Sequence, residues 1–341
     1  MPLTVLRSEA EWASLAAEWN ALLDSSATDV PFLRHEYLMA WWQHRGGGEW
    51  PAESELFIVV ARDEAGALVG IAPLFFAPDK TGQPALLLLG SVEISDFLDL
   101  IARPEDLPGF ITELLTLLTG PDAPAWQRLE WLNLLEDSPT LPALKAAAEA
   151  AGLTYTQERL QPAPYIPLNG DFDAWLESID GKERQELRRK LRNAGRYPAP
   201  VSLYRLEDEA TFDDEFTQFG LLMKQERGKQ DFLTPEMGSQ MAAIARAALK
   251  AGYLDLRFLT AGKQKAAALF CFDYKNRIWG YNSGLETRFA DLSPGAVLLG
   301  LTLMDACETN REAFDFMRGD EEYKYRYGGV ARWVVRARIE R

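Results

Sequence analysis

The sequence is poor in the residues that build metal sites and covalent catalytic pairs. Only two cysteines, Cys271 and Cys307, and two histidines, His35 and His44, occur among the 341 residues. Two cysteines do not form a disulfide scaffold, and two histidines exclude a histidine-rich metal site. A Ser-His-Asp or Cys-His arrangement would need one of these histidines, and both lie in the aromatic, helix-like stretch PFLRHEYLMAWWQH. We therefore expect no metal site and no nucleophile–histidine pair.

Long apolar runs and an excess of basic residues are also missing. The longest apolar stretch, from Gly295 to Met304, is interrupted by Thr302, and it is far shorter than the roughly 18–20 residues that cross a bilayer. The amino-terminal segment has acids within its first dozen residues and no hydrophobic signal core. With 36 basic and 51 acidic residues the net charge is −15, which argues against a nucleic-acid footprint. The expectation is a cytoplasmic protein without a membrane span or a nucleic-acid partner.

What the sequence does have is a globular composition arranged in two similar halves. Hydrophobic residues make up 47% of the chain, and its length suits about two domains of roughly 150 residues. Each half contains helices, then a group of buried strands, a helix, a strand and a closing strand. We predict an α/β (α+β) protein with a first unit over 1–170, a basic linker helix over 171–197 and a second unit over 198–341.

Four segments carry a family pattern. They are PFLRHEYLMAWWQHRGG, LLGSVEISDFLDLI, GKERQELRRKLRNAGR and, most specifically, NSGLETRFADLSPGAVLLGLTLMDACETNREAFDFMRGDEEYKYRYGG. Together they resemble the double GNAT-type acyltransferases, in particular a CelD/BcsL-type branch related to the FemABX peptidyltransferases. The resemblance covers nearly the whole chain. It implies two tandem GNAT-like units, each a mixed, largely antiparallel sheet flanked by helices, with a substrate cleft near their junction.

Arg288, Ser293 and Gly295 surround the predicted start of a helix over 294–309. Ser293 suits the N-cap, Pro294 suits the first helical position, and the free amides of a helix start suit a pyrophosphate. The resemblance implies that the CoA pyrophosphate binds here, although the usual glycine pair is absent and Asp291 would repel phosphate. A plain capped core helix is the alternative.

The segment RGDEEYKYRYGG alternates charged and aromatic residues after a predicted buried strand. Asp320 or Glu321 could deprotonate an attacking amine, and Lys324 or Arg326 could stabilise a tetrahedral intermediate. The resemblance to FemABX proteins implies that basic residues at the positions of Lys324 and Arg326 contact the reacting groups. Tyr323 is a candidate substrate-binding residue. A solvated edge strand is the alternative.

Three further candidates lie on or beside predicted buried strands. Asp96 and Asp99 are expected to be partly desolvated, which would raise the pKa of each carboxyl toward a value useful for a base. The resemblance favours Asp96 as catalytic, with Asp99 near the substrate, and the alternative is turn capping. Tyr281 could protonate the leaving thiolate, or it could be a packing residue.

The predicted linker helix has the highest local charge in the chain. Residues 181–196 contain seven bases and two acids, and the bases could hold a phosphate-bearing substrate. Lys182 and Arg184 correspond to a basic position with that role in some relatives. For the other bases we expect solvated pairs with nearby acids.

These observations predict an acyltransferase that uses acyl-CoA, with acetyl-CoA as the first choice. The acceptor would be an amine or hydroxyl of a small or saccharide molecule, which attacks the thioester directly. One alternative is a FemABX-like aminoacyl or peptidyl transferase, which the negative net charge disfavours because a tRNA donor needs a basic face. Another is a non-catalytic GNAT-like scaffold in polysaccharide biosynthesis. The sequence leaves open which unit holds the donor and which oligomer forms.

Overall fold

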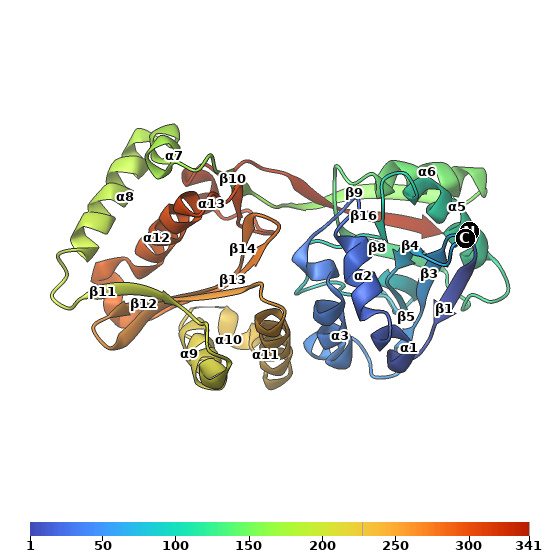
Figure 1. The fold of residues 1–341 in the computed structure, drawn as a ribbon, viewed down its shortest axis with the longest axis horizontal. Coiled ribbons are helices and arrows are strands. Elements are labelled where there is room, and N and C mark those ends of the chain that lie inside the picture. The colour runs from blue at the N-terminus through green and yellow to red at the C-terminus, as the bar shows by residue number, and fades with distance from the viewer. Residues whose placement is uncertain (227, 341) are drawn as a thin grey trace. The chain divides into compact units, whose positions relative to one another are not determined.

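The chain forms two compact units (Figure 1). The computed structural model describes residues 1–226 and 228–340. Unit 1 comprises Met1–Gln161 together with the chain from Trp333 onward, and unit 2 comprises Pro162–Arg332. Both are mixed α/β structures in which mostly antiparallel sheets are flanked by helices, so the predicted fold class is confirmed. No helix in the described ranges is both long and apolar enough to cross a membrane.

Unit 1 contains a small sheet with strand order β1-β3-β4-β7 and a larger sheet with order β2-β5-β6-β8-β16-β9. Its first half contains β1 (Leu3–Leu6), α1 (Glu9–Ala13), α2 (Ala16–Leu23), η1 (Pro31–Leu33), α3 (His35–Gln43), α4 (Arg45–Gly48), β2 (Glu55–Leu56), β3 (Ile58–Arg62), β4 (Leu68–Ala72), β5 (Leu74–Pro78) and β6 (Pro84–Leu88). The remainder contains β7 (Ile101–Ala102), α5 (Leu107–Thr119), β8 (Arg128–Leu135), α6 (Thr140–Ala150), β9 (Thr154–Pro162) and β16 (Trp333–Glu340).

The start of unit 1 shows how sequence signals become packing. Ser8 caps α1 in a reciprocal box with Glu11, whose carboxylate accepts from the Ser8 amide at 3.1 Å. Trp12 and Trp19 are fully buried, and their rings lie 5.4 and 5.7 Å from the ring of His35. His35 is therefore part of an aromatic core.

Unit 2 is built on one six-stranded sheet with the order β10-β15-β14-β13-β12-β11. Helices α7, α8 and α12 cover one face, and α9, α10 and α11 lie on the other (Figure 1). Its elements are β10 (Tyr165–Pro167), α7 (Phe172–Ser178), α8 (Gly181–Ala194), β11 (Val201–Arg205), η2 (Glu209–Thr211), α9 (Phe212–Met223), α10 (Lys229–Phe232), α11 (Pro235–Lys250), β12 (Leu254–Ala261), β13 (Gln264–Tyr274), β14 (Arg277–Leu285), η3 (Thr287–Leu292), α12 (Pro294–Glu308), β15 (Ala313–Asp315) and α13 (Glu322–Arg326).

The basic segment expected as one linker helix is two helices inside unit 2. The break falls at Asp180, whose side chain accepts from the Lys182 amide and caps α8. α8 then packs on α12, where Gly300 leaves room for Leu187 and Leu191. The segment is thus part of the unit 2 core.

The last strand, β16, pairs with a different unit from the one that the sequence predicts. The sequence places residues 333–341 in the second unit, whereas β16 pairs with β8 and completes the larger sheet of unit 1. Val334, Val335 and Ile339 are fully buried there.

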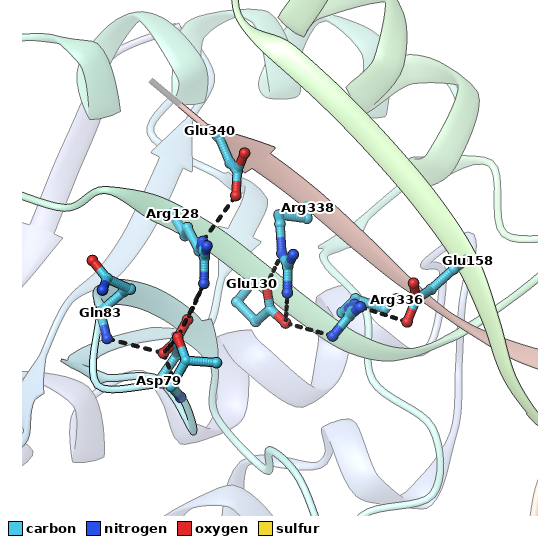
Figure 2. Close-up of polar contacts among 9 residues, drawn as sticks. Asp79, Gln83, Arg128, Glu130, Glu158, Arg336, Arg338 and Glu340 are labelled. Atoms are coloured by element: carbon cyan, nitrogen blue, oxygen red, sulfur yellow. Dashed lines mark hydrogen bonds and ion pairs between the residues drawn. The ribbon is translucent and has the colours of Figure 1, made fainter.

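Ion pairs also join β16 to its neighbours (Figure 2). On β8, Glu130 is 6% exposed and accepts from Arg338 at 2.6 Å and Arg336 at 3.2 Å. Arg336 also pairs with Glu158 of β9 at 2.5 Å. The same strand therefore holds β8 on one side and β9 on the other.

Each six-stranded sheet contains a parallel pair of strands, and in both sheets this pairing is short. β6 and β8 pair over Ala85–Leu87, and β14 and β15 pair over Arg277–Trp279. β6 ends at Leu88 soon after this pairing, whereas β14 continues to Leu285 after β15 has ended at Asp315. We call the side of β14 from Gly280 to Leu285 that faces away from β13 the open edge.

Candidate functional site

The open edge begins at an irregularity in β14. Gly280 pairs with Cys271 and Asn282 with Phe270, so Tyr281 is an extra residue in a β-bulge. The ring of Tyr281 packs on Phe270, with their centroids 5.1 Å apart. Bulges re-aim backbone groups, and this one lies where β14 leaves β15.

Two glycines let other segments approach β14 closely. At Gly280 an added Cβ would lie 2.8 Å from the ring of Phe314 on β15. At Gly284 it would lie 2.5 Å from the backbone nitrogen of Met223, the last residue of α9. The end of α9 is therefore fixed against the far half of the open edge.

Side chains bind both backbone groups of Ser283 on the open edge. Lys229 Nζ donates to the Ser283 carbonyl at 2.6 Å and lies 3.3 Å from its Oγ. The Ser283 amide donates to Asn282 Oδ1 at 2.9 Å. Glu226 Oε1 is 3.1 Å from Lys229 Nζ and completes this cluster.

The segment after β15 is helical where the alternative interpretation expected an edge strand. α13 occupies Glu322–Arg326, and the Lys324 side chain lies inside, because the residue is 2% exposed. Its Nζ donates to the Arg318 carbonyl at 2.7 Å and lies 2.9 Å from Glu321 Oε2. Lys324 therefore holds the turn that leads from β15 into α13.

Tyr323 is the exposed aromatic residue of this region. It is 41% exposed, and its ring packs against Phe316 with centroids 5.7 Å apart. Partial burial, Glu321 and Glu226 together raise the pKa of Tyr323 to about 12. Its hydroxyl is therefore protonated at neutral pH, and the charge of Glu226, the partner of Lys229, contributes to the raised pKa.

The other predicted residues of this segment are engaged elsewhere. Asp320 accepts a hydrogen bond from the Tyr325 hydroxyl at 2.7 Å. Arg326 is 3.9 Å from Glu183 at the start of α8. Of the candidate catalytic residues, the structure thus brings Glu321 and Lys324 into direct contact beside Tyr323.

The start of α12 departs from the expected cap. Ser293 takes the N-cap position and Pro294 the first helical position, as the sequence predicts, but Ser293 is in a left-handed conformation, φ 53°, and its side chain makes no cap hydrogen bond. Gly295 lies against Leu285, the last residue of β14. Arg288 pairs with Glu286 at 3.0 Å, and this contact lowers the pKa of Glu286 to about 2. The start of α12 therefore lies beside the end of the open edge, and the charge of Arg288 is paired with Glu286.

The candidate substrate-binding bases lie on the first turn of α8. Arg184 pairs with Glu177 at 2.6 Å, and Arg188 shares the same carboxylate at 2.9 Å. The backbone amide of Lys182 donates to the Asp180 cap. Arg184 thus forms one of the acid–base pairs expected for the other bases of this helix.

Asp99, one of the two acids predicted in unit 1, is buried. It is 1% exposed and accepts from Thr28 at 2.6 Å, Ser138 at 2.5 Å and the Leu100 amide at 2.8 Å. Burial outweighs these hydrogen bonds and raises the pKa of Asp99. Asp96, by contrast, is half-buried on the loop before it.

That loop, residues 89–100, packs against the part of β8 that lies beyond its short pairing with β6. Asn133 of β8 donates to the carbonyls of Val92 and Ser95, each at 2.9 Å, and accepts from the Leu98 amide at 2.9 Å. Phe97 and Leu98 are buried. In unit 1 the chain itself therefore fills the position next to its central parallel pair.

Sequence reasoning missed Glu226, Lys229 and Ser283. Lys229 and Ser283 are 54 positions apart, and no motif joins them. Within residues 1–226 and 228–340, no group of three or more His, Cys, Asp or Glu side chains could hold a metal ion.

Comparisons with known proteins show what the sequence and the fold are similar to. Residues 181–325 match the family described as "Acetyltransferase (GNAT) domain", and no curated protein sequence matches the chain. The solved structure of FemX is 11% identical, with 99% of this chain and 97% of FemX covered at a TM-score of 0.67. L-PGS from Bacillus licheniformis is 13% identical, with 95% and 91% covered and a TM-score of 0.57. The chain is thus similar to GNAT acetyltransferase domains over residues 181–325 and to FemX in fold along nearly its whole length.

Proposed function

We propose that this protein is an acyltransferase that takes an acyl group, acetyl as the first choice, from acyl-CoA. The proposed acceptor is an amine or hydroxyl of a small or saccharide molecule, and we propose that the protein belongs to the CelD/BcsL-type branch and acts in the cytoplasm. The observation that carries the proposal is the open edge of β14, which begins at the Tyr281 bulge and leads to the start of α12. The GNAT match over residues 181–325 supports acyl transfer in general.

The open edge suits the shape of a CoA thioester. The pantetheine arm carries two amides, which can pair with a strand edge as a short added strand does. Beyond Leu285, the first amides of α12 offer donors and a positive dipole end to the pyrophosphate. A donor laid along β14 would then place its thioester toward the Tyr281 bulge.

The polar residues linked to this edge through Lys229 and Glu226 suit direct transfer. The acceptor nitrogen or oxygen attacks the thioester carbon, the C–S bond breaks, and the acceptor proton passes to a carboxylate, for which Glu321 and Glu226 are candidates. Tyr323 is protonated at neutral pH and can supply a proton to the leaving thiolate. Lys324 acts by shaping the turn before α13, since its amine contacts backbone carbonyls.

We assign the donor to unit 2 because the equivalent position in unit 1 is filled. β6 ends at Leu88, and the following loop takes the edge of β8 through Asn133 and the buried Phe97 and Leu98. Among the described residues of unit 1, the parallel pair β6–β8 therefore leaves no extended strand edge comparable to the open edge.

A matched pair of variants tests this assignment. The helices α5 and α12, which connect the two strands of each parallel pair, both carry a Pro-Gly pair in the first turn, Pro108-Gly109 in α5 and Pro294-Gly295 in α12. Gly295→Asp places a negative charge where the pyrophosphate is proposed to bind, and Gly109→Asp makes the same change in unit 1. In calorimetric titrations with acetyl-CoA and CoA, we expect micromolar binding for wild type and G109D and at least a ten-fold loss for G295D.

Other outcomes separate the alternatives. Loss of binding in G109D alone would move the donor to unit 1. No binding of either ligand to wild type at millimolar concentration would reject the acyl-CoA proposal. The FemX-like fold would then favour testing an aminoacyl donor, with a non-catalytic scaffold as the remaining function.

A further inference from the structure

Lys229 occupies the backbone carbonyl that a donor amide would use. Its Nζ lies 2.6 Å from the Ser283 carbonyl oxygen, in the middle of the open edge. We propose that Lys229 is a specificity-determining residue that substitutes for the donor: its ammonium satisfies the edge in the free protein, and the pantetheine arm must displace it to bind. This inference rests on the proposed acyl-CoA donor.

The contact between Lys229 and Ser283 is supported by side chains that are not part of the sheet. Glu226 lies 3.1 Å from Lys229 Nζ and gives the ammonium a second partner. Nearby, Gln225 accepts from the Thr287 amide at 3.2 Å and donates to Glu286 at 3.1 Å. Side chains therefore attach the residues after α9 to the end of β14, and side-chain contacts can exchange without unfolding the strand.

The contact between the end of α9 and Gly284 of β14 is a backbone contact, so it cannot rearrange as a side-chain contact can. Gly284 lies against the α9 backbone so closely that a Cβ would approach Met223 N to 2.5 Å. α9 therefore keeps the root of the segment in place while the Lys229 side chain moves. The displaced ammonium retains Glu226 as a partner, so displacement leaves no buried, unpaired charge.

The competition follows from the geometry of the carbonyl. An amide that pairs with a strand edge approaches its carbonyl oxygen near the plane of the peptide at about 2.9 Å. The ammonium at 2.6 Å already stands at this oxygen and makes a charge-assisted hydrogen bond. If the edge is free in about one molecule in ten, apparent donor affinity falls about ten-fold. Ligands without an amide arm do not meet Lys229 and are unaffected.

The first experiment compares two lysine variants of the full chain. Lys229→Ala removes the competitor, and Lys224→Ala removes an exposed lysine from the same segment. The probes are CoA, pantetheine and adenosine 3′,5′-bisphosphate, which lacks the pantetheine arm. We expect K229A to bind CoA and pantetheine about ten-fold more tightly than wild type. It should bind the bisphosphate equally, and K224A should match wild type with all three probes.

The second experiment reads the lysine directly. Wild type is labelled briefly with acetic anhydride with and without saturating CoA, and the extent of Lys229 acetylation is measured by mass spectrometry. Displacement predicts that CoA increases labelling of Lys229 several-fold while Lys224 stays constant. A lysine with a purely structural role would keep its low reactivity.

The outcomes distinguish this inference from the proposed function. Equal CoA affinity in wild type and K229A, or unchanged Lys229 labelling, overturns the role of Lys229 while acyl-CoA binding stands. If neither wild type nor K229A binds CoA or pantetheine, both proposals are rejected together. Tighter binding of the bisphosphate by K229A would also overturn the inference, because the effect would then be a general change in charge.

Discussion

At the scale of single residues, burial decides what a charged side chain can do. Lys324 was a candidate for stabilising an oxyanion, yet its amine is enclosed by the backbone of the turn before α13. Asp99 was expected to be partly desolvated, and it is almost fully enclosed, with hydroxyl donors on Thr28 and Ser138. The sequence indicates that such residues lie near buried strands, but the direction of each side chain depends on the fold.

Lys324 provides the first prediction at this scale. Lys324→Met keeps the side-chain length and leaves the Arg318 carbonyl without its donor, which we expect to lower the free energy of unfolding by about 2–4 kcal/mol. Lys263→Met, on the exposed β12–β13 turn, is the control and should change it by less than about 0.5 kcal/mol. Urea denaturation measures both. Equal stability of K324M and wild type would contradict the structural role.

Asp99 gives a prediction with a definite sign in pH. Because burial raises its pKa in the native state, the unfolded chain loses this proton at a lower pH than the folded one. Between the ordinary value of 3.8 and the raised pKa, higher pH therefore favours unfolding. Relative to Asp99→Asn, the wild-type free energy of unfolding should fall as pH rises above 4, by at most about 1.4 kcal/mol per pH unit. Parallel stability curves for the two proteins from pH 4 to 7 would contradict it.

The cluster of Glu226, Lys229 and Ser283 at the open edge could not be predicted from the residues alone, for a physical reason. Lys229 reaches Ser283 because α9 packs on Gly284 and a bulge at Tyr281 sets the direction of the following backbone. Both features depend on strand register, which side-chain chemistry alone does not specify.

At the scale of elements, hydrophobic periodicity predicts whether a segment is a strand or a helix better than it predicts which strand the segment pairs with. The alternating apolar pattern at the end of the chain indicates a strand with one buried face, as β16 shows with Val335, Ala337 and Ile339. The same pattern would fit either sheet, so its pairing with β8 could not be predicted. The alternating charges and aromatics of the five-residue helix α13 also fit the alternative of an edge strand with one solvated face, and the structure shows a helix there.

Removing β16 tests the division of the chain. A protein ending at Arg332 loses the strand between β8 and β9, and Glu130 loses Arg336 and Arg338 (Figure 2). We expect its amides in β8 and β9 to exchange hydrogen at unfolded rates, while those of β12 and β13 remain protected. Hydrogen-exchange mass spectrometry measures both. Retained protection in β8 would show that unit 1 folds without its last strand.

At the scale of the whole molecule, the sequence predicted the two-unit architecture well. Length, composition and repeated element order are enough to indicate two mixed α/β units. The boundaries were harder, since the chain enters unit 2 at Pro162 and returns to unit 1 at Trp333. A contiguous division is the simplest assumption that a sequence permits, and long-range strand pairing overrides it.

A whole-molecule measurement tests where the donor binds without any substitution. Ligand binding stabilises the native state by about 2.7 kcal/mol when the ligand is in hundred-fold excess over Kd. Because the chain forms two compact units, we expect the resulting protection from hydrogen exchange in the unit that binds the ligand. We expect saturating CoA to slow amide exchange in β14 and at the start of α12 and to leave β6 and α5 unchanged. Protection confined to unit 1 would contradict the assignment.

The position of β16 also has a consequence for synthesis. The ribosome completes residues 1–161 long before it reaches the strand that belongs between β8 and β9. Throughout translation of unit 2, those two strands lack their shared partner and present exposed edges. Unit 2 contains its whole sheet by residue 315 and can fold first. The amino-terminal unit is therefore the last to mature, and a chain terminated before Trp333 lacks the strand that completes its larger sheet.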